Sequence, residues 1–399
     1  MIQINAFLHR RILRDLIVRW MLDRLEPTDT LSLMRLVLFN SVYVARYLPM
    51  LSQELLGQLH DCCPSRGRSF DKGDLKDRLI AYRPAKLRGT TPAAVRVRAL
   101  INAYRAQPGR FFRETPFRGT LYYALLQGQN TYVGSSRIKR IRRLAEKSAR
   151  KVVAWLHDTS PLPHALQEES LASHAANAAH PPSACLEHLE AELLCWLRAT
   201  PQDQWPDDIE INDLAGLKVI IEPDEETRLL EILAALGCVL REREPHTGAY
   251  HALNLVVEHR PDKGRILAQP LPSKVLMLFQ EQGVQPEAVR RAFESFVHSG
   301  EDAVQVEIIC SDYAQALEGE IGRCMHEDRI IRQRHHPHHS GQLALNVEFL
   351  LELLFTLPVI PRAHLEQLPI RLWNRYLPDY FDEVKRGLFH LPSIELELE

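Results

Sequence analysis

The chain has 399 residues, 45% of them hydrophobic, which is enough for a large core divided over two or three domains. No stretch approaches the roughly 20 apolar residues of a membrane span, so we expect no membrane partner. The seven cysteines are dispersed without the paired spacing of a zinc site, which favours reduced thiols and a cytoplasmic protein.

Charge is distributed unevenly along the chain. Residues 1–155 hold 29 Lys and Arg against 11 Asp and Glu, whereas the remaining residues hold 20 against 40. Such asymmetry indicates a half that binds a polyanion, or two halves that attract each other. Nucleotide phosphates, RNA and the acidic half itself are therefore the candidate partners of the basic half.

Residues 1–110 are predicted to form a helical N-terminal domain. Apolar residues recur at helical spacing over 1–24 and are interrupted by charged ones. This pattern predicts an amphipathic helix docked on a neighbouring helix rather than a signal peptide. Further predictions in this region are helices over 33–44, 52–60 and 92–106 and a loop over 65–72.

Residues 111–335 alternate between predicted strands and helices, which indicates one layered α/β unit. The segment 120–127 fits a strand or a helix, and both stay open. Strands are predicted over 217–221, 238–242, 250–259 and 303–310, and helices over 136–157, 184–199, 225–236, 286–298 and 313–327. Residues 159–183, rich in Pro, Ala, Ser and His, are predicted to be a linker or insertion. Residues 336–399 are predicted to be a helical C-terminal segment.

The first segment whose residues suggest a chemical function is Val133–Lys151, which is strongly basic. Its cations are Arg137, Lys139, Arg140, Arg143 and Lys147, with others beside them. We expect Arg137 and Lys139 at a helix start, where backbone N–H groups also point at an anion. Arg137, Arg140 and Lys147 would share a helical face and clamp a triphosphate. A solvated basic face, or one paired with the acidic half, explains the same residues.

Three further segments follow in the acidic half. Asp208–Ile221 places Leu217, Val219 and Ile221 on one strand face, and its Asp213 is also explained as a cap or turn residue. His246–Arg260 contains Tyr250, whose ring can stack on a base, and Asn254. In the fourth segment, Ala303–Glu327, Gln305 and Glu307 should share one face of a strand.

Taken in order, these four segments resemble the RelA/SpoT nucleotidyltransferase family, which makes the alarmone (p)ppGpp. The resemblance covers residues 111–330 and implies an α+β fold with a central mixed β-sheet, flanked here by N- and C-terminal helical regions. It implies pyrophosphate transfer from ATP to the 3′-hydroxyl of a guanine nucleotide, with Mg²⁺ as cofactor. Its implied nucleotide-binding residues are Arg137, Lys139, Arg140, Arg143, Lys147, Lys218, Tyr250 and Asn254.

The sequence also departs from the family pattern. The stretch that precedes the tyrosine in the family is missing, and with it one of two metal-binding carboxylates, for which Glu242 or Glu244 would have to substitute. Gln305 stands where the other metal-binding carboxylate belongs, and Glu307 follows two positions later. Asp213 and Glu307 are therefore the expected catalytic and metal-binding residues.

These departures leave two functions open: a synthetase with a degenerate site, or a catalytically inactive nucleotide- or RNA-binding regulator or scaffold. A protein partner and transfer of pyrophosphate to tRNA are further possibilities. The cluster His335–His339 suggests a transition-metal site or a solvated loop, and Pro337 inside it favours the loop.

Overall fold

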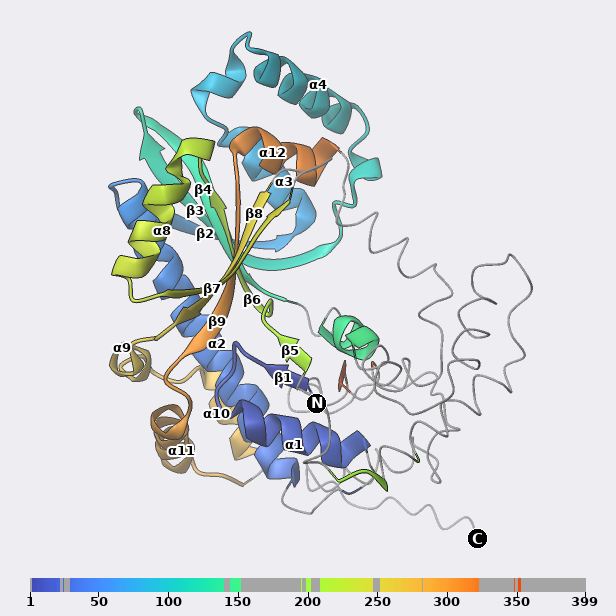
Figure 1. Ribbon diagram of the computed structural model, residues 1–399, viewed down its shortest axis with the longest axis vertical. Coiled ribbons are helices and arrows are strands. Elements are labelled where there is room, and N and C mark those ends of the chain that lie inside the picture. The colour runs from blue at the N-terminus through green and yellow to red at the C-terminus, as the bar shows by residue number, and fades with distance from the viewer. Residues whose placement is uncertain are drawn as a thin grey trace, which may run out of the picture.

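The computed structural model describes residues 2–21, 24, 29–139, 144–151, 195, 199–201, 209–246, 252–281, 283–322, 348 and 351–352. A mixed seven-stranded sheet lies at the centre, with helices against it (Figure 1). This confirms the predicted α+β class with a central mixed sheet. The RelA/SpoT-type arrangement within that class stays a prediction.

The strands of the described chain are β1 (Ile2–Ile4), β2 (Ser65–Asp71), β3 (Pro116–Leu126), β4 (Gln129–Ile138), β5 (Ile209–Ile211), β6 (Ala215–Ile220), β7 (Val239–His246), β8 (Ala252–His259) and β9 (Val304–Ser311). The central sheet has the order β2-β3-β4-β6-β9-β8-β7, and β1 pairs with β5 in a separate two-stranded sheet. Within the central sheet only β6 and β9 run parallel, and they are neighbours at its middle.

The helices are α1 (Arg10–Met21), α2 (Asp29–Leu59), α3 (Lys72–Ala81), α4 (Pro92–Ala106), α8 (Glu226–Ala235), α9 (Lys263–Leu267), α10 (Ser273–Gln280), α11 (Pro286–Ser299) and α12 (Tyr313–Leu317). Shorter helical turns are η1 (Ala85–Arg88), η2 (Pro108–Phe111), η4 (Pro223–Glu225) and the π-helical η5 (Glu318–Gly322). The predicted helices over 92–106, 225–236 and 286–298 match α4, α8 and α11 closely.

One face of the sheet, which we call the covered face, packs against α2, and α8, α10 and α11 belong to the same buried core. Leu217 and Val219 of β6 lie on it with Val306 and Ile308 of β9, and all four are buried in the larger core. The predicted alternation in β6 is confirmed. The same core includes α1 and α2 as well as the central strands, so it crosses the predicted domain boundary at residue 110.

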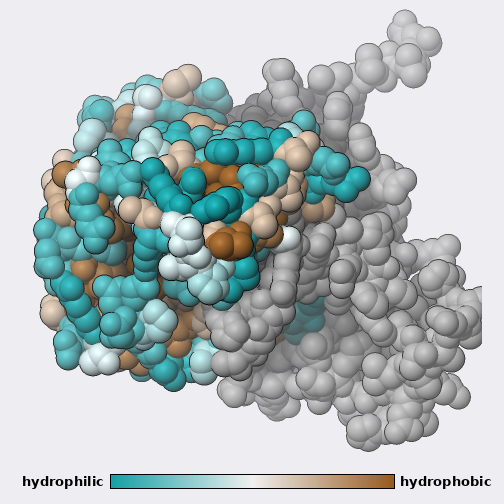
Figure 2. Space-filling view, turned by 90° about the horizontal axis from the view of Figure 1, so that it is seen from above, coloured by the Kyte–Doolittle hydropathy of each residue, from teal (hydrophilic) through white to brown (hydrophobic). Residues whose placement is uncertain are grey.

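The opposite face is covered only in part, by α3, α4 and α12, which gather at one end of the sheet (at the top of Figure 1). There Leu121, Tyr132 and Ile220 form a second core with Leu79 of α3 and Leu317 of α12. Seen from that end, hydrophilic residues cover most of the described surface, with small hydrophobic patches between them (Figure 2). We call this second side of the sheet the site face.

Two local predictions were wrong, and an alternative that stayed open is decided by strand pairing. The segment 65–72, predicted to be a loop because of its Gly, Ser and charged residues, is mainly the edge strand β2, where polar residues are common. The segment 120–127, left open, lies almost entirely in strand β3. The two predicted helices over 33–44 and 52–60 are one helix, α2, which continues through Pro49.

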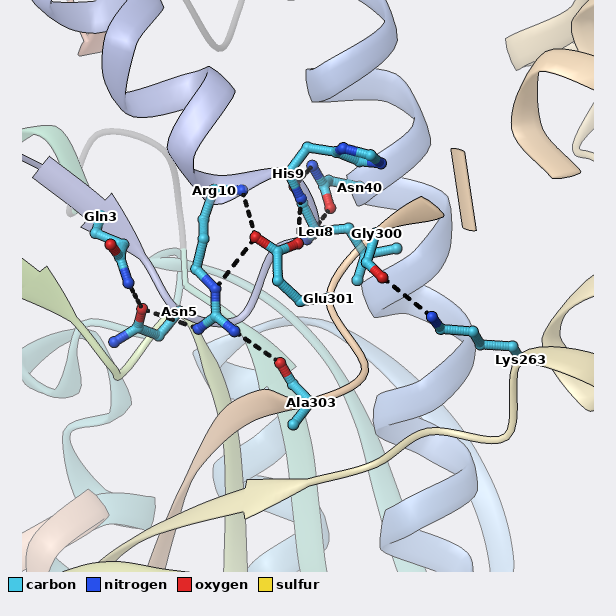
Figure 3. A network of polar contacts seen from close by, with 10 residues as sticks. All are labelled: Gln3, Asn5, Leu8, His9, Arg10, Asn40, Lys263, Gly300, Glu301 and Ala303. Carbon is cyan, nitrogen blue, oxygen red and sulfur yellow. Dashed lines mark hydrogen bonds and ion pairs between the residues drawn. The ribbon is translucent and has the colours of Figure 1, made fainter. Parts of the chain in front are cut away.

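A polar network holds the N-terminal segment against the residues that lead into β9 (Figure 3). The Glu301 carboxylate accepts hydrogen bonds from the backbone N–H groups of His9 (2.5 Å) and Arg10 (3.1 Å) and so caps α1. The Arg10 guanidinium donates to the Ala303 carbonyl (2.9 Å) and to Asn5 Oδ1 (3.1 Å). Leu13 and Leu16 of α1 are buried, as the amphipathic pattern predicts. In the residues described, no helix is long and apolar enough to cross a membrane.

Candidate functional site

The centre of the candidate site is Asp213, in the short loop between β5 and β6. Two elements from elsewhere in the chain hold this loop. Strand β1 pairs in parallel with β5, and Asn5 Nδ2 donates to Asn212 Oδ1 at 2.7 Å. On the other side, the backbone N–H of Lys139 donates to the Leu214 carbonyl at 2.8 Å. The position of Asp213 therefore depends on β1 and on the end of β4.

Two lysines bind the same oxygen of Asp213. Lys139, directly after β4, forms an ion pair with Asp213 Oδ2, and Lys147 Nζ lies 2.5 Å from that oxygen. Lys147 belongs to the helical residues 144–151, and Lys151, one turn later, donates to the Glu210 carbonyl at 2.7 Å. The spacing of four residues puts both lysines on the helix face that contacts the segment 210–213.

The electrostatics of this cluster keep Asp213 ionised. Burial opposes the charge, but Lys139 and Lys147 together outweigh burial and lower the pKa of Asp213 to about 2. Burial also lowers the pKa of Lys139, although the Asp213 carboxylate favours its charged form. The site therefore holds one carboxylate that shares two cations.

Glu307 of β9 is the second carboxylate. It pairs in register with Gly216 of β6, and Asn254 Nδ2 of β8 lies 3.4 Å from Glu307 Oε1. Burial and the nearby Asp213 raise the pKa of Glu307, whereas Lys139 and Arg137 oppose the rise. The structure thus brings Asp213, Glu307 and Asn254 of the predicted site together, with Lys139 and Lys147.

Arg137 lies near these residues, but the local prediction for it was wrong. It belongs to strand β4 and pairs in register with Gly216, instead of starting a helix over 136–157. Residues up to Ile138 extend β4 because they pair with β3 and β6, and long-range pairing overrides the helical pattern. Arg137 and Lys147 are consequently not on one helical face. A Cβ added at Gly216 would lie 3.7 Å from Glu307 Oε2, which is an ordinary van der Waals contact.

Lys218 belongs to a different charged group. Its Nζ lies 3.9 Å from Glu320 Oε1, and Lys72 Nζ binds the other oxygen of Glu320 at 2.6 Å. Glu320, in η5, and Lys72, at the start of α3, are both buried. Through Glu320, these ionic contacts link η5 and α3 to β6. Lys218 therefore has a structural role beside the site.

Four parts of the prediction lie outside the described residues. These are Arg140 and Arg143, Tyr250, the cluster His335–His339, and the segment 159–183. The C-terminal segment 336–399 is described only at 348 and 351–352.

The donor set at the site is compatible with Mg²⁺, although among the described residues no three His, Cys, Asp or Glu side chains gather as a metal-binding group. Asp213 Oδ1 is buried and has no hydrogen-bond partner there, and the same holds for Gln305 Oε1 and Asn254 Oδ1. Buried oxygen acceptors without partners indicate a place for a cation, a water or a ligand N–H group. Carboxylate oxygens from Asp213 and Glu307 are ligands that Mg²⁺ prefers.

Glu242, one of the two substitutes considered for the missing carboxylate, lies close to this cluster. Its Oε1 accepts a hydrogen bond from Asn212 Nδ2 at 3.2 Å, next to Asp213. Glu244 contacts His246 at 4.0 Å instead. Sequence reasoning missed Asn5, Lys151 and Glu320, because their roles depend on contacts between segments far apart in the chain, such as the pair Asn5 and Asn212.

No protein-family model, no curated protein and no solved structure matches this chain.

Proposed function

We propose that this protein is a nucleotide diphosphotransferase of the RelA/SpoT type, which transfers pyrophosphate from ATP to the 3′-hydroxyl of a guanine nucleotide. The observation that carries the proposal is the convergence of cations and carboxylates around Asp213. The cations Lys139 and Lys147 come from the end of β4 and the helix after it, and the carboxylates come from the loop before β6 and from β9.

Phosphoryl-type transfer depends mainly on positioning and on stabilisation of charge, and both can be supplied by these side chains. Lys139 and Lys147 bind Asp213 Oδ2. When a polyphosphate binds, its oxygens replace the carboxylate as partners of the two lysines, and Arg137 adds a third cation. The released Asp213 and the nearby Glu307 would then hold Mg²⁺, which neutralises phosphate charge when bound.

The chemistry requires a proton acceptor for the attacking hydroxyl. The ribose 3′-oxygen forms a bond to the β-phosphorus of ATP, the bond from that phosphorus to the bridging oxygen breaks, and AMP leaves. We assign this role to Glu307, because burial and the nearby Asp213 raise its pKa and so favour its taking up a proton. Asn254 and Gln305 offer amide oxygens that suit the N–H groups of a guanine.

Two observations favour a second function, nucleotide binding without catalysis. Asp213 Oδ2 forms ion pairs with two lysines, which compete with a metal for this oxygen. Gln305 stands where the family resemblance places a metal-binding carboxylate. Such a protein would bind a nucleotide through Lys139 and Lys147 and would have no need of a metal.

Incubation with ATP, GDP or GTP and Mg²⁺, followed by anion-exchange separation, tests the proposal. We expect AMP and a guanine nucleotide that carries two additional phosphates, and loss of both products in Glu307→Gln but not in the matched control Glu231→Gln on the exposed side of α8. No product, together with ATP binding that is equal in Mg²⁺ and in EDTA, supports the second function. No nucleotide binding at all contradicts both.

A further inference from the structure

A second basic region lies on the covered face, away from Asp213. A groove with a volume of about 840 Å³ runs between α2 and the ends of strands β2, β3 and β4. Among the described residues five arginines line it and no Asp or Glu does: they are Arg46, Arg66, Arg68, Arg118 and Arg137. A groove lined by arginines, with no carboxylate among its described lining residues, is an electrostatic site for an anion.

Three of these arginines are free to bind a ligand. Arg66, Arg68 and Arg118 are exposed, and within the described chain none of them forms an ion pair or a side-chain hydrogen bond. Arg46 differs, because its guanidinium is buried and donates to the carbonyls of Ile266 and Pro270 at 2.7 Å each. Arg46 therefore shapes the wall of the groove, and the three exposed arginines supply its available charge.

Strand register places the three exposed arginines next to one another. Arg66 and Arg68 are two residues apart in β2, so they share a face, and Arg68 pairs with Thr120 of β3. Arg118 lies two residues from Thr120 and points to the same face. Like charges on neighbouring strands repel each other, and phosphate groups that bind between them remove that repulsion.

An exposed aromatic ring lies beside these cations. Phe70 lines the groove, and 65% of its surface is exposed, the joint highest exposure among the large hydrophobic residues described. An arginine track combined with an exposed aromatic face is the arrangement by which proteins bind single-stranded nucleic acid, with phosphates on the arginines and a base on the ring. The helix α2 bounds the groove on one side, which suits a flexible strand whose bases can turn outward.

We propose that this groove binds single-stranded nucleic acid through Arg66, Arg68, Arg118 and Phe70. The site is separate from the nucleotide chemistry proposed for Asp213 and goes beyond it.

The test is fluorescence anisotropy with labelled oligo-U and oligo-dT of about 12 nucleotides, and with a duplex of the same length. We expect salt-dependent binding of the single strands and weaker binding of the duplex. The double variant Arg66→Gln, Arg68→Gln should weaken binding about 10-fold or more and reduce the salt slope by about 1.4. Phe70→Ala should weaken it by about 5- to 100-fold without changing the salt slope.

The matched control is the double variant Arg105→Gln, Arg110→Gln, which removes the same charge from exposed positions outside the groove. We expect this control to bind like the unaltered protein. Equal weakening by both double variants, tighter binding of the duplex, or no binding of either single strand would overturn the proposal. Preference for oligo-U over oligo-dT would identify RNA as the ligand, and equal binding would identify single strands of either sugar. Thermal unfolding of each variant separates lost binding from lost folding.

Discussion

The two faces of β6 and β9 differ although the same short strands form both. On the covered face Leu217, Val219, Val306 and Ile308 are buried against helices. On the site face the intervening positions of these strands include Gly216, Lys218, Gln305 and Glu307, which are only partly buried. A strand that alternates in this way stabilises the fold with one set of residues and leaves the other set for polar chemistry.

This contrast teaches where changes should alter stability and where they should alter function. Neighbouring residues of a strand lie on opposite faces. Substitutions at two neighbouring positions should therefore differ in effect, one changing mainly stability and the other mainly function.

The largest difference is expected between Glu307 and its neighbour Val306. Glu307→Gln removes the proton acceptor and a metal ligand, and should lower the diphosphotransferase rate by about 1,000-fold with little change in folding. Val306→Ala should instead leave the rate per folded molecule nearly unchanged, while it lowers the free energy of unfolding by about 1 to 3 kcal/mol. Steady-state kinetics and denaturant unfolding measure the two effects. Equal loss of rate in both variants would contradict the division between faces.

The next effect concerns the lysines on Asp213. Lys147→Met should weaken ATP binding by about 10- to 100-fold, since a charge-assisted hydrogen bond contributes about 1.5 to 3 kcal/mol. Calorimetric titration measures this, and Lys218→Met is the control, because Lys218 faces Glu320 instead. If both variants bound ATP equally well, Lys147 would have no role as a phosphate ligand.

Two glycines, one on each face of the sheet, differ in how much room their surroundings leave for a side chain. A Cβ at Gly134 of β4 would lie 2.5 Å from the Lys218 carbonyl and 3.3 Å from the Leu56 side chain of α2, whereas at Gly216 it meets only ordinary contacts. Gly134→Ala should therefore lower the free energy of unfolding by about 1 to 3 kcal/mol, and Gly216→Ala should cost less than half as much. Urea unfolding of both variants measures the difference, and the reverse order would contradict the packing described for β4.

The smallest effect is a difference in acid sensitivity. Burial lowers the pKa of His259 on the covered face to about 4, so the unfolded chain binds a proton more readily and stability falls as pH drops from about 6.5 towards 4. On the site face the pKa of Asp213 is lowered to about 2, so its contribution is lost only as pH drops below about 3.8. His259→Gln should therefore flatten the pH dependence between pH 6.5 and 4, by about 1 kcal/mol at pH 5.5, in unfolding measurements. An unchanged profile would show that another group, such as the half-buried His60, dominates that range.

The sequence predicts those features that depend on local alternation and spacing. It places Leu217 and Val219 on one face of β6 and puts Gln305 and Glu307 on one face of β9, and both predictions hold. It fails for Arg137, because a run of basic residues is compatible with a helix, and only pairing with β3 and β6 makes it a strand.

Other parts of the site depend on contacts that no local pattern reveals. Strand β1 has only three residues and pairs with β5 across more than 200 positions, yet it positions Asp213 through Asn5. The groove of Arg66, Arg68 and Arg118 likewise depends on the register between β2 and β3. The sequence of β2 itself predicts a loop. Local alternation and spacing were enough to predict the fold class. The full site could not be predicted, because it depends on long-range pairing of this kind.

The most direct test of the division between faces is a crystal structure with Mg²⁺ and a non-hydrolysable ATP analogue. The account predicts that the phosphates lie on the site face, within hydrogen-bond distance of Lys139 and Lys147, with both ion pairs to Asp213 broken. Phosphates bound instead among Arg66, Arg68 and Arg118, with the Asp213 ion pairs intact, would contradict it.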